Sequence, residues 1–387
     1  MIHFKARENV PRWLNFVVPL AGVAVAVIVA GIVLAATGHN PLATYKHIVQ
    51  ASITQPGAFS QTLVSMTPLM FTGLAAAVAF RMRLWNIGGE GQLYMGAVGA
   101  AGAGLFFHSL PGPLLILVMI VAGVLAGSLW ASIPGALRAY LNTNEILTTL
   151  MLNYVAANVM YYLIFDSTSY WRDLTSASAK VFPQGKYLPA TAAWPPLQLG
   201  SVTIPFGLLL GIGLALLLWG MIRATRYGYE MRVLADSPAV GKYAGMRTRR
   251  KILSLMAISG GLAGLGGASQ VGDFSHTLDP RGLEQASFGY SGIVVAALAR
   301  YNPVAVIVTS FFIGMLVNAG FALQGPGFPI GLTGTMEGIL LFCVLGAEIF
   351  TRYRLTVRLP HARARTTTPV PPPPVPVGQA ATHGGTS

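Results

Sequence analysis

The chain has 387 residues, of which 53% are hydrophobic and only 10% are charged, and its formal net charge is +13. Soluble domains carry about 25% charged residues, so this composition excludes an ordinary water-soluble protein and indicates that lipid covers much of the surface. Basic residues gathered on one side of a membrane explain the positive charge better than nucleic-acid binding does, and we expect no nucleic-acid partner.

Ten apolar runs follow one another along the chain, and most approach the roughly 20 residues that span a bilayer core. They lie at residues 16–36, 63–80, 91–107, 114–133, 146–165, 204–222, 252–271, 290–298, 304–323 and 338–350. The run at 290–298 is too short to span alone, so it either begins near Leu283 or forms a half-helix that ends inside the protein. We therefore predict an all-α polytopic membrane protein with about ten transmembrane helices within residues 16–352.

The distribution of Lys and Arg orients these helices. With residues 1–15 in the cytoplasm, twenty of the 25 basic residues fall on the inner side, eight of them in the loop at 223–251, and five fall outside. This bias predicts two cytoplasmic termini and an extracytoplasmic loop at 166–203. The two five-helix halves then have opposite orientations, as in an inverted repeat. The Pro-rich segment 366–387 is predicted to be a disordered cytoplasmic tail.

The basic loop at 223–251 contains the signals of a short helix. Asp236 or Ser237 can cap a helix whose first turn holds Pro238, and Gly245 suits its C-terminal end. A capped helix between two spans has a purpose if another protein docks on it. The alternative is an ordinary positive-inside loop whose charges only hold the orientation. Local sequence does not decide between these two interpretations.

Residues 227–246 (YGYEMRVLADSPAVGKYAGM), followed by ISGGLAGLGG at 258–267, resemble the permeases of bacterial ABC importers for simple sugars and nucleosides. Those permeases are similar to the ten-helix membrane subunit of the vitamin B12 importer. Their loop between helices six and seven touches the ATPase and reads approximately R-A-V-G-x-N-P-x-A-A-x-Y-A-G-I. This chain departs from that pattern at Ala235, Ser237 and Gly241. The resemblance implies an ATPase-coupling loop formed by Arg232, Asp236, Ser237, Pro238, Tyr243, Ala244 and Gly245.

Two further segments resemble the nucleoside branch of this family. LWNIGGEGQ at 84–92 is similar to F-N-I-G-A-E-G-Q, and NEILTTLMLNY at 144–154 is similar to N-E-V-x-x-T-x-M-L-N-Y. The motif residues are Asn86, Gly88, Glu90, Gly91, Gln92, Asn144 and Glu145. Glycines permit close packing, and an acid at a helix start complements the helix dipole, so a structural role is favoured over substrate contact.

Polar residues at membrane depth are the candidates for lining a pathway. Asn153, Tyr154, Asn158 and Gln270 fall within the predicted spans and should face protein or water rather than lipid. Tyr154, beside Asn153, can stack on a ring. Asn153 and Asn158 are equally consistent with hydrogen bonding between helices and with lining of a pathway.

The sequence contains no G-x-x-x-x-G-K-[ST] phosphate loop and no H-E-x-x-H motif, so we expect no cofactor, no metal and no enzymatic activity. The resemblance implies the membrane-spanning subunit of an ATP-driven importer for nucleosides or simple sugars in the bacterial plasma (inner) membrane. Its implied partners are an ABC ATPase, a second permease, identical or homologous, and an extracytoplasmic substrate-binding lipoprotein. The rival interpretation is an ion-coupled secondary transporter with inverted repeats, which explains the five-plus-five layout but not the capped loop.

Overall fold

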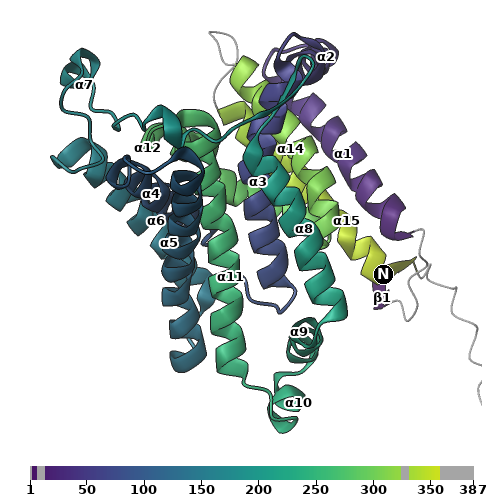
Figure 1. The fold of residues 1–387 in the computed structure, drawn as a ribbon. Helices are drawn as coiled ribbons and strands as arrows, with labels where there is room; N and C mark the ends of the chain where they lie inside the picture. The colour runs from purple at the N-terminus through teal and green to yellow at the C-terminus, as the bar shows by residue number, and fades with distance from the viewer. Residues whose placement is uncertain (1, 7–13, 324–330, 358–387) are drawn as a thin grey trace, which may run out of the picture.

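A computed structural model describes residues 2–6, 14–323 and 331–357 of the chain. The predicted tail at 366–387 lies outside the described residues. Figure 1 shows a bundle of long helices, with the short helices α2, α7 and α12 at one end and α9 and α10 at the other.

The long helices are α1 (Leu14–Ala36), α3 (Ala58–Phe80), α4 (Gly89–Phe106), α5 (Gly112–Leu141), α6 (Glu145–Tyr161), α8 (Phe206–Ala224), α11 (Thr248–Ser269), α14 (Pro303–Leu323) and α15 (Gly331–Arg352). The shorter helices are α2 (Pro41–Val49), α7 (Ala177–Val181), α9 (Arg226–Asp236), α10 (Pro238–Tyr243), α12 (Pro280–Ala286) and α13 (Phe288–Leu298). Wider or tighter helical turns form η1 (Gln50–Thr54), η2 (Tyr162–Asp166), η3 (Ala190–Ala192) and η4 (Gln270–Ser275).

Six of the described helices are long and apolar enough to cross a membrane, or up to seven if the bent pair of α1 and α2 with η1 counts as one span. The six are α3, α5, α6 with η2, α8, α11 with η4, and α14. The prediction of a polytopic helical membrane protein is therefore confirmed. The number ten stays a prediction, because the run at 290–298 forms the 11-residue α13, whose length of about 16 Å is half a bilayer core.

Two short antiparallel sheets complete the fold. β1 (Ile2–Ala6) pairs with β4 (Tyr353–Val357), with Ile2 opposite Val357 and Ala6 opposite Tyr353. β2 (Leu197–Leu199) pairs with β3 (Val202–Ile204) just before α8. Because β1 precedes α1 and β4 follows α15, this pairing brings the start of α1 and the end of α15 to the same side of the molecule.

The core of the bundle is formed by α3 and α11, with α4, α5 and α6 on one side and α8, α14, α15 and α1 on the other (Figure 1). In the most apolar stretch of each span, 94% of α3 and 72% of α11 with η4 are buried, against 28% of α5. The exposed residues of α5 are large and apolar, including Leu117, Leu125 and Leu129. Such a face suits lipid, so α5 lies at the margin of the bundle.

Glycines bring α11 and α5 into backbone contact. A Cβ atom on Gly264 would lie 2.4 Å from the carbonyl oxygen of Gly123, and one on Gly127 would lie 2.2 Å from that of Gly260. No side chain fits at such separations. Small residues at helix crossings are the usual means of close packing in membrane proteins, and here they run along both faces of the crossing.

The variant Gly264→Val should fail to form the folded bundle. Its side chain meets backbone atoms that cannot rotate away, so the penalty exceeds the roughly 1–3 kcal/mol typical of overpacking. The measurement is the yield of monodisperse detergent-extracted protein and its thermal unfolding midpoint. The matched control is Gly213→Val on the exposed side of α8, where a Cβ atom meets nothing within 4 Å, and it should behave as wild type.

Candidate functional site

A non-helical segment, residues 84–88, joins α3 to α4 and is largely buried in the bundle. Asn86 is only 2% exposed, and Leu84 and Gly88 are also buried. The segment leads to Gly89, which packs against Gly289 in the first turn of α13. Because α13 is about 16 Å long and the chain beyond it is bonded to Arg81 at the end of α3, this junction lies deep in the bundle. Non-helical backbone at membrane depth needs protein partners for its polar groups.

The amides of Asn86 and Gln92 provide such partners. Each side chain donates to the other, at 3.0 and 2.9 Å, and Asn86 Oδ1 also accepts from the Gly88 amide at 3.0 Å. Asn86 Nδ2 donates to Ser259 Oγ at 2.8 Å, and Ser259 donates in turn to the carbonyl of Ala75 on α3. The network joins the non-helical segment 84–88 to α3 and α11.

Asn153 connects the same segment to α6 and α13. Its Oδ1 accepts from the Gly91 amide at 2.9 Å, and its Nδ2 donates to the Ile87 carbonyl at 3.0 Å and to the Tyr290 hydroxyl at 3.2 Å. The side chain is 3% exposed. A Cβ atom on Gly91 would lie 3.0 Å from Asn153, which explains the glycine at that motif position. In this structure Asn153 therefore bonds helices to one another.

Glu90 caps a helix other than its own. Its Oε2 accepts from the backbone amides of Gly289 and Tyr290, at 2.6 and 3.1 Å, in the first turn of α13. The carboxyl group is 2% exposed. A negative group at the start of a helix satisfies open N–H groups and complements the helix dipole. Glu90 thus fixes the start of α4 against the start of α13.

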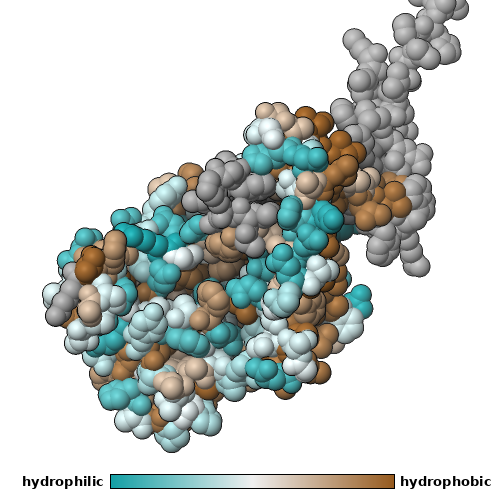
Figure 2. Space-filling model, turned by 90° about the horizontal axis from the view of Figure 1, so that it is seen from above, coloured by the Kyte–Doolittle hydropathy of each residue, from teal (hydrophilic) through white to brown (hydrophobic). Residues whose placement is uncertain are grey.

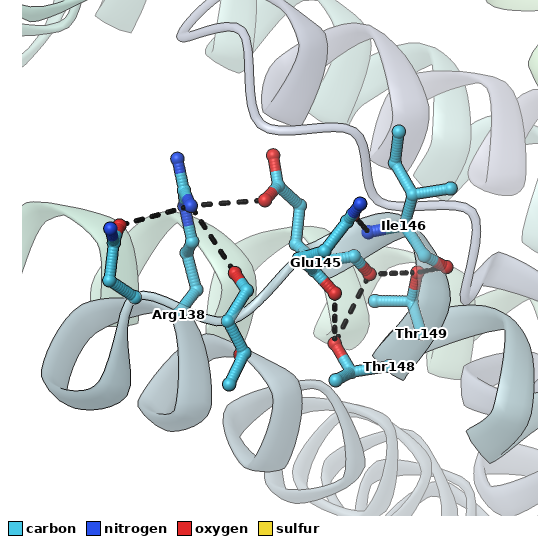
Figure 3. Close-up of polar contacts among 8 residues, drawn as sticks. Arg138, Glu145, Ile146, Thr148 and Thr149 are labelled. Atoms are coloured by element: carbon cyan, nitrogen blue, oxygen red, sulfur yellow. Dashed lines mark hydrogen bonds and ion pairs between the residues drawn. The ribbon is translucent and has the colours of Figure 1, made fainter.

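The second motif forms the start of α6 (Figure 3). Asn144 is the capping residue, since its Oδ1 accepts from the Ile146 amide at 2.9 Å. Glu145, the first helical residue, lies 3.2 Å from Arg138 at the end of α5. Arg138 also donates to Asn142 and to the Thr143 carbonyl. These contacts join α5 to α6.

One face of α6 is polar and exposed in the second half of the helix. Tyr154, Asn158 and Tyr161 follow at helical spacing; Tyr154 is 61% exposed, Asn158 is exposed and Tyr161 is half-buried. Asn158 donates to the Tyr154 carbonyl at 2.8 Å. Toward the start of α6 the same face carries Leu147 and Met151. The other predicted pathway residue, Gln270, is half-buried at the first position of η4, which packs against α4 and α3.

The predicted coupling loop folds into α9 and α10 at the end of the bundle (Figure 1). Ser237, rather than Asp236, caps α10 by accepting from the Val240 amide at 3.4 Å; Asp236 is the last residue of α9. Pro238 opens α10, and Gly245 takes a φ of +75° just after it, where glycine is favoured. Tyr243 is 96% exposed.

Several contacts hold α9 and α10 against the spans. Arg232 donates to the Ile222 carbonyl of α8 at 2.9 Å, so this predicted coupling residue bonds its own chain. Glu230 bridges Arg226 and Lys251, at 2.8 and 2.6 Å, and these hydrogen bonds lower the pKa of its carboxyl group. Leu234 is buried against Gly241. The loop is thus an ordered element that is held against the spans and leaves Tyr243 exposed.

Comparison with known proteins decides what these elements belong to. Residues 58–345 match the family described as the branched-chain amino acid transport system / permease component. The chain belongs to this permease family. It is therefore a membrane-spanning, multi-pass transport subunit of an ABC importer and not an enzyme, as the sequence motifs predicted.

Individual relatives are similar to the permease along most of its length. A glucose ABC transporter permease protein of Haloferax volcanii is 29% identical, covering 91% of this chain and 92% of the relative. A nucleoside ABC transporter permease protein of Lactococcus lactis is 26% identical, covering 90% and 94%. A guanosine ABC transporter permease protein of Bacillus subtilis is 28% identical, covering 79% and 86%.

Three features of the permease escaped the sequence analysis. Ser259 completes the network around Asn86. It lies in the Gly-rich run at 258–267, a composition that is typical of close helix packing in membranes. Tyr290 receives a hydrogen bond from Asn153. Asp273 accepts from the amides of Phe206 and Gly207 and so caps α8 from a distant segment. Within the described residues, no group of three His, Cys, Asp or Glu side chains could hold a metal ion.

Proposed function

We propose that this permease pairs with a second permease, identical or homologous, and that nucleosides cross the membrane between the two along the polar face of α6. The observation that carries the proposal is the exposure of Tyr154 and Asn158 on a membrane-spanning helix. In lipid the Asn158 side chain would have only its hydrogen bond to the Tyr154 carbonyl, whereas a water-filled path would also hydrate it. The exposed face of α5, in contrast, is apolar and suits lipid.

Nucleosides are favoured over free sugars by residue chemistry. Aromatic rings beside amides suit a flat base with hydrogen-bonding edges, and Tyr154 and Asn158 offer both groups on one helix face. Relatives from Lactococcus lactis and Bacillus subtilis carry nucleoside and guanosine in their names, while the relative from Haloferax volcanii carries glucose. The motifs at 84–92 and 144–154 resemble the nucleoside branch.

Energy for transport comes, in this proposal, from an ABC ATPase docked on α10. Tyr243 and Val240, at 96% and 57% exposure, form an apolar tip on a helix that is otherwise anchored to the spans. Exposed aromatic residues on rigid elements are typical anchors of protein interfaces. A substrate-binding lipoprotein delivers the nucleoside at the opposite end, where Figure 2 shows many hydrophilic residues. An ion-coupled transporter has no need of α10, and the family membership does not favour it.

We infer ten membrane crossings, with both termini in the cytoplasm of a bacterial cell. The six spans, together with α1, α4, the pair α12 and α13, and α15, give ten. The pairing of β1 with β4 supports an even number, since it brings the two ends together. The basic loop, with α9 and α10, then lies in the cytoplasm, in agreement with the positive-inside pattern.

Reporter fusions test this topology. A periplasm-active reporter fused after Thr37 should be active, and one fused after Arg352 should be inactive, because an even number of crossings returns the chain to the cytoplasm. A cytoplasm-active reporter should give the opposite pattern at both positions. Periplasmic activity at Arg352 would overturn the ten-crossing topology.

Uptake assays test the substrate. Cells that contain the permease with its ATPase and binding protein should accumulate labelled nucleosides, and unlabelled nucleosides should compete at least tenfold better than ribose. The control is the same cells without the permease. Ribose uptake that no nucleoside reduces would contradict the nucleoside assignment and leave the importer assignment intact.

A further inference from the structure

Two side-chain contacts tie α12 to the outer end of α6. The Tyr161 hydroxyl donates to the Glu284 carboxylate. One turn further out, the Arg281 guanidinium lies over the Phe165 ring, 4.9 Å from its centroid. The Tyr161 and Phe165 rings are themselves 5.3 Å apart. The two contacts hold Glu284 at the end of the polar face of α6.

Glu284 presents its carboxylate without a cation to neutralise it. Its side chain is exposed, and none of the ion pairs among the described residues includes it. Arg281, the cation one turn away on the same helix, is stacked on Phe165. A carboxylate has two oxygens with several acceptor positions, and the single Tyr161 hydroxyl occupies only one of them. The Glu284 carboxylate can therefore accept further hydrogen bonds.

The residues around Glu284 have the chemistry of a binding surface. Tyr154 and Asn158 lie along the same face of α6, and Tyr290, 38% exposed, is held by Asn153 at the start of α13. Beside Phe165 and Arg281 a cavity of about 240 Å³ opens at the outer end. Rings, an amide and a carboxylate thus lie on α6, α12 and α13 of a chain in which only 10% of residues are charged.

We propose that Glu284, positioned by Tyr161, accepts hydrogen bonds from the vicinal hydroxyls of the substrate's sugar ring and so makes the permease selective for ribose over deoxyribose. This inference rests on the proposed function, because it takes the polar face of α6 as the pathway. Hydrogen bonds to a charged acceptor are stronger than neutral ones, and two neighbouring hydroxyls match two carboxylate oxygens. A site that binds a hydroxyl group rejects the analogue that lacks it.

The test compares a labelled purine ribonucleoside with its 2′-deoxy counterpart in proteoliposomes that hold the complete importer. Since the binding protein is the same throughout, a change in the ratio of the two uptake efficiencies, kcat/KM, comes from the permease. Glu284→Gln should lower the efficiency for the ribonucleoside about ten- to hundredfold, and that for the deoxynucleoside less than threefold. Tyr161→Phe should shift the ratio in the same direction, about three- to tenfold.

The matched control is Asp166→Asn, which neutralises another exposed acid, the last residue of η2 after α6, and should leave the ratio unchanged. Equal losses for both substrates in Glu284→Gln would overturn the inference and assign Glu284 to docking or to packing, and an unchanged ratio would overturn it as well. Should that variant not accumulate in the membrane, Tyr161→Phe decides by the same ratio.

Failure of the proposed function gives a different result. If the wild-type importer takes up sugars but no nucleoside, the nucleoside assignment is wrong. The selectivity is then measured with ribose and 2-deoxyribose, and the same loss of ratio in Glu284→Gln supports the role of Glu284.

Discussion

The variant Glu90→Ala is expected to lose most of its folded protein and its transport. The change removes the acceptor of two buried backbone amides in the first turn of α13. A buried donor left without a partner costs about 1–3 kcal/mol, so the two together cost roughly 2–6 kcal/mol. Folded proteins are stable by only about 5–15 kcal/mol. The measurement is the amount of permease in the membrane and its thermal unfolding midpoint in detergent.

Glu145→Ala is the matched control for this prediction. Glu145 also lies at a helix start and its side chain is only 9% exposed, but among the described residues it accepts from no buried backbone amide of another helix, and its partner Arg138 is 34% exposed and keeps its hydrogen bonds to Asn142 and Thr143. The control should therefore lose less stability than Glu90→Ala. Glu90→Gln, which keeps an acceptor oxygen, should fall between the two. If Glu90→Ala and Glu145→Ala were equally stable, the α4–α13 junction would not depend on the Glu90 carboxylate.

Placing an acid at the tip of α10 should uncouple the permease. In Tyr243→Glu, an exposed ring becomes a charge that the ATPase interface must desolvate, and loss of an aromatic anchor commonly costs about 2 kcal/mol or more. Uptake should fall at least about tenfold, and loaded binding protein should no longer stimulate ATP hydrolysis by the assembled importer. The amount of permease in the membrane should not change, because Tyr243 is 96% exposed.

A second tyrosine in the same loop provides the comparison. Tyr229 on α9 is 56% exposed, and Tyr229→Glu adds the same charge away from the tip of α10, so transport should be much less affected. Gly245→Pro should uncouple as Tyr243→Glu does, since proline cannot adopt the φ of +75° that ends α10. Transport that survives both Tyr243→Glu and Gly245→Pro would show that the loop only anchors the orientation.

The sequence by itself determined the membrane class, the permease family and the local shape of the loop at 223–251. Few charges and repeated apolar runs require lipid, whatever the packing of the helices. The α10 helix followed from Pro238 and Gly245, because caps and turns depend on neighbouring residues. The motifs at 84–92 and 144–154 pointed to the family, although they did not reveal which side chains meet.

Only the tertiary structure decided what the motif residues do. Glu90 and Gly289 are 199 positions apart, and Asn86 and Ser259 are 173 apart, so no local pattern links them. Asn153 and Asn158 lie on one helix five residues apart, yet the first is buried among backbone groups and the second is exposed. The physical reason is that a buried backbone amide must find an acceptor, and the long-range packing of the helices sets which side chain supplies it.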